Sequence, residues 1–317
     1  MPIIKIGSRK SRLATIQSEF VQHKLQGFLA SEWKVEIVFF DTKGDQVLDK
    51  ALHKVGDKGL FTAELEGALA SGDIDLAVHS LKDLPTAANA ELPIVAISER
   101  ESPSDCVIFS NRFKEVTDIF DLPQGSKIGT SSLRREAQLK HLRPDFEVMP
   151  IRGNVETRIR KVEQAEGGLA AGLLAEAGIN RLKLHHHMGQ ILKPQSFIPA
   201  PGQGALAIQS SQKVLEDKPA LHKALLQIHH PETALTTNLE RKLLNSIDGG
   251  CQTPFGAYVK ALENNKVEIY TVLGLNTEGN KTNNNYCFYK SLQNLPIEDI
   301  DTEMENLTTE LRNKKEL

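Results

Sequence analysis

Two stretches of this chain alternate short apolar runs with helical patterns, and this alternation narrows the possible folds more than any other feature. In the first stretch the apolar runs are residues 3–6, 35–40 and 76–78, and the helical patterns are residues 11–29 and 61–70. Short apolar strands that alternate with helices of this length are typical of βαβ units around a parallel sheet. The first stretch therefore predicts an α/β lobe.

The second stretch repeats this plan after Pro103. Residues 127–129 and 147–151 are expected to be strands, and residues 132–142 and 154–165 helices. The junctions are also alike, since Lys5-Ile6-Gly7-Ser8-Arg9 and Lys127-Ile128-Gly129-Thr130-Ser131 each lead from a strand into a helix. We therefore expect two similar α/β lobes around a cleft, with ligands at the carboxyl ends of their strands.

The pattern changes from about residue 212 onward. Residues 219–229 and 231–245 are expected to be helices, residues 258–262 and 267–273 a hairpin, and residues 296–314 a final helix. We expect a first lobe of residues 1–99 with 199–218, a second lobe of residues 100–198, and an α+β domain of residues 219–317.

Composition excludes several classes of function. The chain has 317 residues, with 38 Lys and Arg against 41 Asp and Glu, so its net charge of −3 gives no sign of a nucleic-acid or membrane-surface partner. It has no apolar run long enough to span a bilayer, and its first residues lack the pattern of a secretory signal. The three cysteines have no CxxC spacing, which disfavours a disulfide framework. We expect a cytoplasmic location.

Basic residues gather at the predicted ends of strands. Arg9, Arg134, Arg135 and Arg152 stand at such junctions. Arginine suits carboxylates and phosphates because its planar group donates two parallel hydrogen bonds, and the amino ends of helices also attract anions. A polyanionic ligand is therefore indicated. The alternative is that these arginines lie on solvated helix faces, and that Ser8, Ser11 and Ser132 only cap helices.

A second polar group follows the apolar run 76–78, where His79, Ser80, Lys82 and Asp83 stand close together. Polar side chains at the carboxyl end of a buried strand are typical of an active-site edge. Asp83 could act as a general acid or stabilise a developing positive charge, and it could equally be the N-cap of a helix.

The charged, glycine-containing segment 43–59 is predicted to be a lid over an anionic ligand, and it lacks the Walker pattern of a nucleotide-binding loop.

Cys251 lies between two glycines and a proline, so a turn that exposes its thiol is expected, and it is a candidate nucleophile. Cys106 and Cys287 stand beside apolar or aromatic residues and are expected to be inert. His185, His186 and His187 are adjacent and have no carboxylate at ligand spacing. No metal site is predicted.

Eight motifs together resemble the porphobilinogen deaminase (hydroxymethylbilane synthase) family in the same order along nearly the whole chain. They are Gly7-Ser8-Arg9-Lys10-Ser11, Thr42-Lys43-Gly44-Asp45, Lys54-Val55-Gly56-Asp57-Lys58-Gly59, Val78-His79-Ser80-Leu81-Lys82-Asp83, Gly129-Thr130-Ser131-Ser132-Leu133-Arg134-Arg135, Ile151-Arg152-Gly153-Asn154, Pro201-Gly202-Gln203-Gly204 and Gly249-Gly250-Cys251-Gln252. The resemblance implies two periplasmic-binding-protein-like (type II) lobes and a third domain. The implied reaction joins four porphobilinogen molecules head to tail, releases ammonia at each step and frees linear hydroxymethylbilane by hydrolysis.

The resemblance also implies a role for particular residues. A dipyrromethane cofactor would be attached to Cys251 through a thioether, Asp83 would be the catalytic carboxylate, and Lys54 and Lys58 would lie on a mobile loop. The residues implied to hold acetate and propionate groups are Arg9, Ser11, Lys82, Ser132, Arg134, Arg135, Arg152, Arg158 and Arg181. The family also suggests a monomer. Several carboxylates per pyrrole chain fit the arginine-rich strand ends found above.

One stretch departs from the family pattern. Residues 167–174, just before the segment with Arg181, are rich in Gly and Ala and poor in residues that favour strands, so the strand implied there is in question.

Two other functions fit the same residues. A non-catalytic two-lobe module that binds anions would share the fold but would have no use for an exposed Cys251. A transferase that uses Cys251 directly as a nucleophile would release its product from that sulfur. The resemblance to the porphobilinogen deaminase family instead implies an adduct on Cys251 that persists.

Overall fold

The computed structural model describes residues 1–42, 62–87, 89–249, 253–275 and 287–315. These residues form two compact units. One contains the described residues up to Glu101 together with Gly204–Leu235, and the other contains Ser102–Gln203 together with the described residues from Thr236 onward. Lys54, Lys58 and Cys251 lie outside the described residues.

The first unit is built on a five-stranded sheet in the order β2-β1-β3-β10-β4. Its strands are β1 (Ile3–Arg9), β2 (Lys34–Phe40), β3 (Leu76–Ser80), β4 (Ile94–Ile97) and β10 (Leu206–Gln209). Strands β1, β2 and β3 run parallel, whereas β10 is antiparallel to both β3 and β4. Its helices are α1 (Arg12–Phe28), α3 (Ala63–Ser71), α7 (Gln212–Asp217) and α8 (Pro219–Ile228), and the short 3-10 helix Leu81–Asp83 follows β3.

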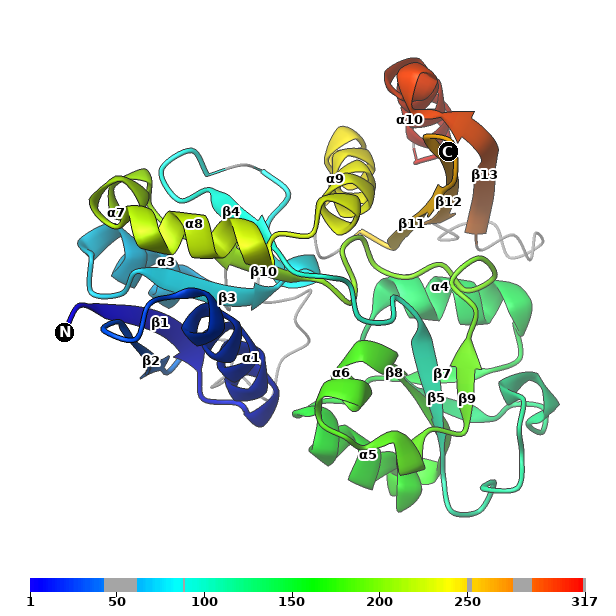
Figure 1. Cartoon of the computed structure of the whole chain (residues 1–317). Coiled ribbons are helices and arrows are strands. Elements are labelled where there is room, and N and C mark those ends of the chain that lie inside the picture. The colour runs from blue at the N-terminus through cyan, green and yellow to red at the C-terminus, as the bar shows by residue number, and fades with distance from the viewer. Residues whose placement is uncertain (43–61, 88, 250–252, 276–286, 316–317) are drawn as a thin grey trace. The chain divides into compact units, whose positions relative to one another are not determined.

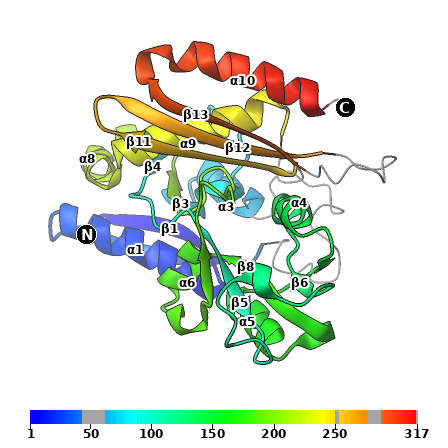
Figure 2. The ribbon, with the colours of Figure 1, turned by 90° about the vertical axis from the view of Figure 1, so that its right-hand side faces the viewer.

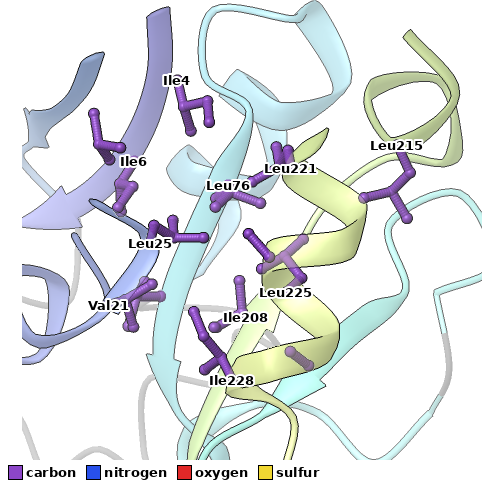
Figure 3. Packing of buried hydrophobic residues seen from close by; sticks show 14 residues of the cluster. Ile4, Ile6, Val21, Leu25, Leu76, Ile208, Leu215, Leu221, Leu225 and Ile228 are labelled. Atoms are coloured by element: carbon purple, nitrogen blue, oxygen red, sulfur yellow. The ribbon is translucent and has the colours of Figure 1, made fainter. Parts of the chain in front are cut away.

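One face of this sheet packs against α1 and α8, as Figure 3 shows. Ile4, Leu76 and Ile208 come from three different strands and meet Leu25 of α1 and Leu225 of α8, all of them fully buried. Each such side chain stabilises the fold by about 1.5–3 kcal/mol through the apolar surface that it removes from water. Helix α8, which we expected in the third domain, thus shares its core with the first lobe.

The second unit contains a sheet of the same plan in the order β7-β6-β8-β5-β9. Its strands are β5 (Asp105–Phe109), β6 (Lys127–Gly129), β7 (Glu147–Met149), β8 (Leu169–Ala175) and β9 (Gln190–Leu192). Its helices are α4 (Leu133–Leu142), α5 (Val155–Glu163) and α6 (Glu176–Arg181), with 3-10 turns at Ile119–Asp121, Glu166–Gly168 and His185–His187. The antiparallel strand beside the parallel ones is β5 in the second lobe and β10 in the first. β5 is the first strand after the chain enters the second lobe, and β10 is the first strand after the chain returns to the first lobe. Figure 1 shows the order of the elements.

Strand β8 settles the question raised by the Gly- and Ala-rich stretch. Residues 169–174 are all buried in it, and it pairs with both β5 and β6. A side chain at Gly172 would lie 2.5 Å from Cγ2 of Val162 on α5. Small residues here therefore let the helix pack closely on the sheet, and the strand forms despite its weak strand propensity, with one irregularity in its pairing with β6 between Leu169 and Ala171.

The C-terminal part of the second unit is a three-stranded antiparallel sheet with two helices. It consists of α9 (Pro231–Ser246), which begins in the first unit, then β11 (Phe255–Leu262), β12 (Lys266–Gly274), β13 (Cys287–Pro296) and α10 (Ile300–Lys315), with a 3-10 turn at Ile297–Asp299. The predicted hairpin is confirmed. The last helix begins four residues later than predicted, because residues up to Pro296 belong to β13, a strand that was not foreseen.

The two faces of this small sheet have different partners. Val259 and Ile269 pack with Leu307 of α10, which lies along the sheet in Figure 2. The opposite face, with Val272 and Tyr289, packs against Ala137 of α4.

Two α/β lobes of one plan and a small α+β element confirm the predicted α/β fold class. The three domain ranges given above stay a prediction. Among the described residues, no helix has the length and apolar character needed to cross a bilayer.

Candidate active site

In the first unit, the predicted residues lie at the carboxyl ends of β1 and β3. Arg9 is the last residue of β1 and is partly buried. Ser11 is the N-cap of α1, since its hydroxyl accepts a hydrogen bond from the backbone N–H of Ala14 at 3.4 Å. Ser8 is buried and donates to the carbonyl oxygen of Arg9 at 3.0 Å, so it is not an N-cap.

Asp83 stands at the end of the 3-10 helix that follows β3. It is the last residue of that helix, so the alternative reading as an N-cap is wrong. Its side chain is exposed, Lys82 beside it is partly buried, and Leu81 is fully buried. The buried side chain of Leu81 holds the turn in place, while the carboxylate of Asp83, two residues later, remains accessible to a ligand. No hydrogen bond or ion pair joins the Asp83 carboxylate to another described residue.

In the second unit, Arg134 and Arg135 form a buried ion cluster with one carboxylate. Nη2 of Arg134 donates to Oδ2 of Asp105 at 2.8 Å, and Nη2 of Arg135 donates to Oδ1 at 2.7 Å. The three side chains are 5%, 9% and 0% exposed, respectively. Both arginines lie in the first turn of α4, which Ser132 caps by accepting from the N–H of Arg135 at 3.5 Å. Neither arginine lies on a solvated helix face.

This cluster is electrostatically tight. Burial by itself would raise the pKa of Asp105, but the two guanidinium groups outweigh it and hold that pKa well below its ordinary value. Burial also lowers the pKa of Arg134, and the negative charge of Asp105 offsets part of this lowering. The three groups together carry one positive charge in excess, in a place where little water can screen it. Nε of Arg135 has no hydrogen-bond partner among the described residues.

Neutral groups complete the cluster. Nε2 of Gln203 donates to Oδ1 of Asp105 at 2.9 Å. The remaining Nη1 atoms donate to backbone carbonyl oxygens, Arg134 to Ile198 at 2.6 Å and Arg135 to Leu173 at 3.0 Å. Sequence analysis missed Asp105. The available signal was a charged residue that opens a strand whose next four residues are apolar.

The other predicted arginines of the second unit follow β7 and β8. Arg152 comes three residues after β7, and burial lowers its pKa. Nε of Arg158, on α5, donates to the carbonyl oxygen of Gly153 at 2.7 Å. Gly153 has a φ of +116°, and a Cβ there would lie 2.6 Å from Cγ2 of Thr157, so glycine is required at this turn. Arg181 is the last residue of α6 and is partly buried.

The thiols and imidazoles take structural positions. Cys106 and Cys287 are free and buried, and burial raises the pKa of each to about 12, as expected for thiols of low reactivity. His185–His187 form a 3-10 turn in which Nδ1 of His187 contacts a carboxylate oxygen of Glu163.

Comparisons with known proteins agree with these motifs. Residues 4–218 match a family model described as porphobilinogen deaminase, dipyromethane cofactor binding domain, and residues 234–288 match porphobilinogen deaminase, C-terminal domain. The chain is 44% identical over 269 residues to the porphobilinogen deaminase of Chloroherpeton thalassium, which covers 85% of this chain and 82% of that protein. It is 45% identical over 258 residues to that of Chromobacterium violaceum, covering 81% and 80%.

Among solved structures, the periplasmic sulfonate-binding protein SsuA of Methylobacillus flagellatus aligns with a TM-score of 0.41 at 15% identity, over 74% of this chain and 68% of that one.

Proposed function

The chain belongs to the porphobilinogen deaminase family, and from this premise we propose that it is a transferase that joins four porphobilinogen molecules head to tail. Ammonia leaves at each step, and hydrolysis then frees linear hydroxymethylbilane. The region that matches the dipyrromethane-binding domain spans both α/β lobes, and the family belongs to tetrapyrrole biosynthesis.

The observation that carries the assignment of the site is the excess positive charge of the Asp105 cluster. Two guanidinium groups share one carboxylate in a buried place, and Nε of Arg135 lacks an acceptor among the described residues. A substrate that brings carboxylates supplies the missing negative charge and acceptor. Carboxylates of dipyrromethane and of the growing pyrrole chain fit this arrangement.

The remaining anion-binding residues follow from their places at strand and helix ends. The proposal assigns carboxylate binding to one set on the first lobe and to a second set on the other. These are Arg9, Ser11 and Lys82, and Ser132, Arg134, Arg135, Arg152, Arg158 and Arg181. Support comes from the partial positive charge of helix amino ends at Ser11 and Ser132, which adds to that of the arginines.

Asp83 is proposed as the catalytic residue. An exposed carboxylate at a strand end can approach the pyrrole nitrogen and stabilise the positive charge that develops when ammonia leaves. The buried Leu81 two residues earlier holds the turn in place, so the carboxylate needs little reorganisation during the reaction.

Cys251 is proposed as the attachment point of dipyrromethane, through a thioether, and Lys54 and Lys58 as parts of a loop that covers the ligand. When bound, the cofactor supplies a fixed primer to which pyrrole units are added. A cytoplasmic location and a monomeric state complete the proposal. The two described cysteines, Cys106 and Cys287, are both free thiols, which fits a reducing compartment.

Mass spectrometry of the intact protein tests the function. We expect the purified chain to carry a permanent two-pyrrole increment that maps to Cys251, and to release ammonia when it is given porphobilinogen. Cys251→Ser should lack both the increment and the activity, while Cys287→Ser, at a buried thiol of the same chain, should keep both. An active wild-type protein without the increment would refute the proposed cofactor attachment.

A further inference from the structure

Gln138 is a fully buried residue of α4 that the proposed mechanism does not use. It lies one helical turn after Arg134, on the same face of the helix. Its side-chain amide binds the backbone of Ile198 twice. Oε1 accepts from the N–H of Ile198 at 2.8 Å, and Nε2 donates to the carbonyl oxygen of Ile198 at 3.0 Å. An apolar side chain of the same length could make neither bond, so helix packing alone does not explain a glutamine here.

The carbonyl oxygen of Ile198 is also an acceptor for Arg134. Nη1 of Arg134 donates to it at 2.6 Å, while Nη2 donates to Oδ2 of Asp105 at 2.8 Å. Ile198, Arg134 and Asp105 are all buried, so water competes little for these hydrogen bonds. The positions of the carbonyl oxygen and of the carboxylate therefore set the orientation of the guanidinium group.

Strand β11 contacts the same backbone segment. The N–H of Ala257 donates to the carbonyl oxygen of Pro199 at 3.1 Å. A Cβ at Gly256 would lie 2.8 Å from the carbonyl oxygen of Ile198 and 2.9 Å from that of Pro199, so glycine lets the two backbones approach closely. Residues 198–199 thus connect α4 with β11, the strand that follows Cys251 along the chain.

We propose that Gln138 is a positioning residue, which holds the backbone of Ile198 and thereby fixes the guanidinium group of Arg134 in the orientation that binds a carboxylate of the substrate. This inference rests on the proposed role of Arg134. A guanidinium group has five N–H donors, and the bonds to Ile198 and Asp105 use two of them. Hydrogen bonds weaken steeply when their angle is poor, so a guanidinium group that turns loses affinity for a carboxylate.

Gln138→Met tests the role of the amide. Methionine has a similar length but cannot bond to the backbone of Ile198, so the carbonyl oxygen that orients Arg134 is no longer held from α4. We expect the KM for porphobilinogen to rise about tenfold, and kcat to change less than about twofold, because Arg134 binds the substrate in the ground state and the transition state alike. Intact-protein mass spectrometry should still show the two-pyrrole increment.

Gly256→Ala tests the same link from β11 and leaves Gln138 in place. The added methyl group would meet the carbonyl oxygens of Ile198 and Pro199, so this backbone segment must shift. The oxygen that Arg134 and Gln138 share moves with it, and KM should again rise at nearly constant kcat. Either variant decides the question if the other does not fold.

Gly274→Ala is the matched control for Gly256→Ala. It lies on the neighbouring strand β12, where the three atoms nearest to an added Cβ belong to Ala137 and Pro254, at 2.8 to 3.0 Å. The steric conflict is of similar size and also involves α4, but it is not with residues 198–199. The melting temperature should fall as in Gly256→Ala, whereas KM should stay at the wild-type value.

Two results would overturn the proposal. A wild-type KM in folded Gln138→Met or folded Gly256→Ala would mean that these residues only stabilise the fold. An equal rise of KM in Gly274→Ala would mean that any disturbance of this sheet affects the substrate.

Arg134→Leu separates this proposal from the function on which it rests. An unchanged KM in Arg134→Leu contradicts the proposed role of Arg134 itself. A raised KM in Arg134→Leu, together with a wild-type KM in Gln138→Met, contradicts the role of Gln138 alone.

Discussion

The two lobes share one strand plan but surround their basic side chains differently. In the second lobe, Arg134 and Arg135 converge on the buried Asp105, which sits at the start of the antiparallel strand β5. In the first lobe, the buried group beside Arg9 is the imidazole of His79 on β3. In the second lobe two buried guanidinium groups share one buried carboxylate, whereas in the first lobe a buried imidazole, whose pKa burial lowers, lies beside the partly buried Arg9.

Two aspartates, Asp83 in the first lobe and Asp105 in the second, also differ in their surroundings. Asp83 is exposed at the end of a 3-10 helix, while Asp105 is fully buried and accepts hydrogen bonds from two guanidinium groups and an amide. We propose that the exposed carboxylate serves the reaction, whereas the buried one stabilises the two arginines around it. Environment, rather than residue type, distinguishes these roles.

The largest expected effect is on turnover, at Asp83. Asp83→Asn keeps the shape of the side chain and removes its charge, so kcat should fall by a factor of about 10³ while the melting temperature changes little. Steady-state release of ammonia from porphobilinogen measures the first quantity, and thermal unfolding followed by circular dichroism measures the second.

Asp73→Asn is the matched control for Asp83→Asn. Asp73 is also exposed and in the first lobe, where its carboxylate accepts from the hydroxyl of Ser71. It should retain the wild-type rate. Equal rates in the two variants would remove Asp83 from the catalytic machinery.

At Asp105 the expected effect is on stability. Asp105→Asn leaves two buried guanidinium groups without a counter-charge, and removal of one partner from a buried ion pair costs about 3–5 kcal/mol of unfolding free energy. The melting temperature should fall by roughly 10 °C, at about 2–4 °C per kcal/mol for a domain of this size.

Asp145→Asn provides the comparison for Asp105→Asn within the same lobe. Asp145 binds Arg143 through two hydrogen bonds of 2.7 and 2.8 Å, but both side chains are about one fifth exposed. Its loss should lower the melting temperature much less, because water can solvate the arginine that remains. Similar losses at both positions would show that burial is not what makes the Asp105 cluster matter.

The sequence predicted the α/β lobes and the C-terminal hairpin because these depend on local periodicity. Strand β13 was missed, since it follows a long connection and has buried and exposed positions in no regular order. The Gly- and Ala-rich strand β8 was questioned because its strand propensity is low, but it is fixed by the close approach of α5 at Gly172. Tertiary packing overrode local preference there.

The candidate site, too, could be predicted from local sequence patterns only in part. Arg134 and Arg135 were singled out correctly as a pair at a strand-to-helix junction, but their shared partner, Asp105, is about 30 residues away in the sequence. The lowered pKa of His79 depends on its burial in the sheet between β1 and β10, two strands that are not adjacent to β3 along the chain. Partners that only folding brings together leave no pattern in a single sequence.

The smallest expected effect concerns two glycines in the repeated strand ends of the two lobes. Gly7, in β1, and Gly129, in β6, stand at corresponding positions of Lys5-Ile6-Gly7 and Lys127-Ile128-Gly129. A Cβ at Gly7 would lie 2.4 Å from Cδ1 of Ile74, which is itself buried, whereas the nearest atom to a Cβ at Gly129 is 3.4 Å away. Gly7→Ala should therefore cost about 1–3 kcal/mol through overpacking.

Gly129→Ala should cost less than Gly7→Ala, because an added methyl group meets only ordinary contacts and reduces the freedom of the unfolded chain. Melting temperatures of the two variants provide the measurement. Ile74→Val in the Gly7→Ala background removes the atom that a Cβ would meet and should recover part of the loss. If Gly7→Ala and Gly129→Ala lower the melting temperature equally, the close packing of α3 residues and Ile74 on β1 is not what requires glycine at position 7. The two lobes would then be more alike in their cores than in the surroundings of their charged residues.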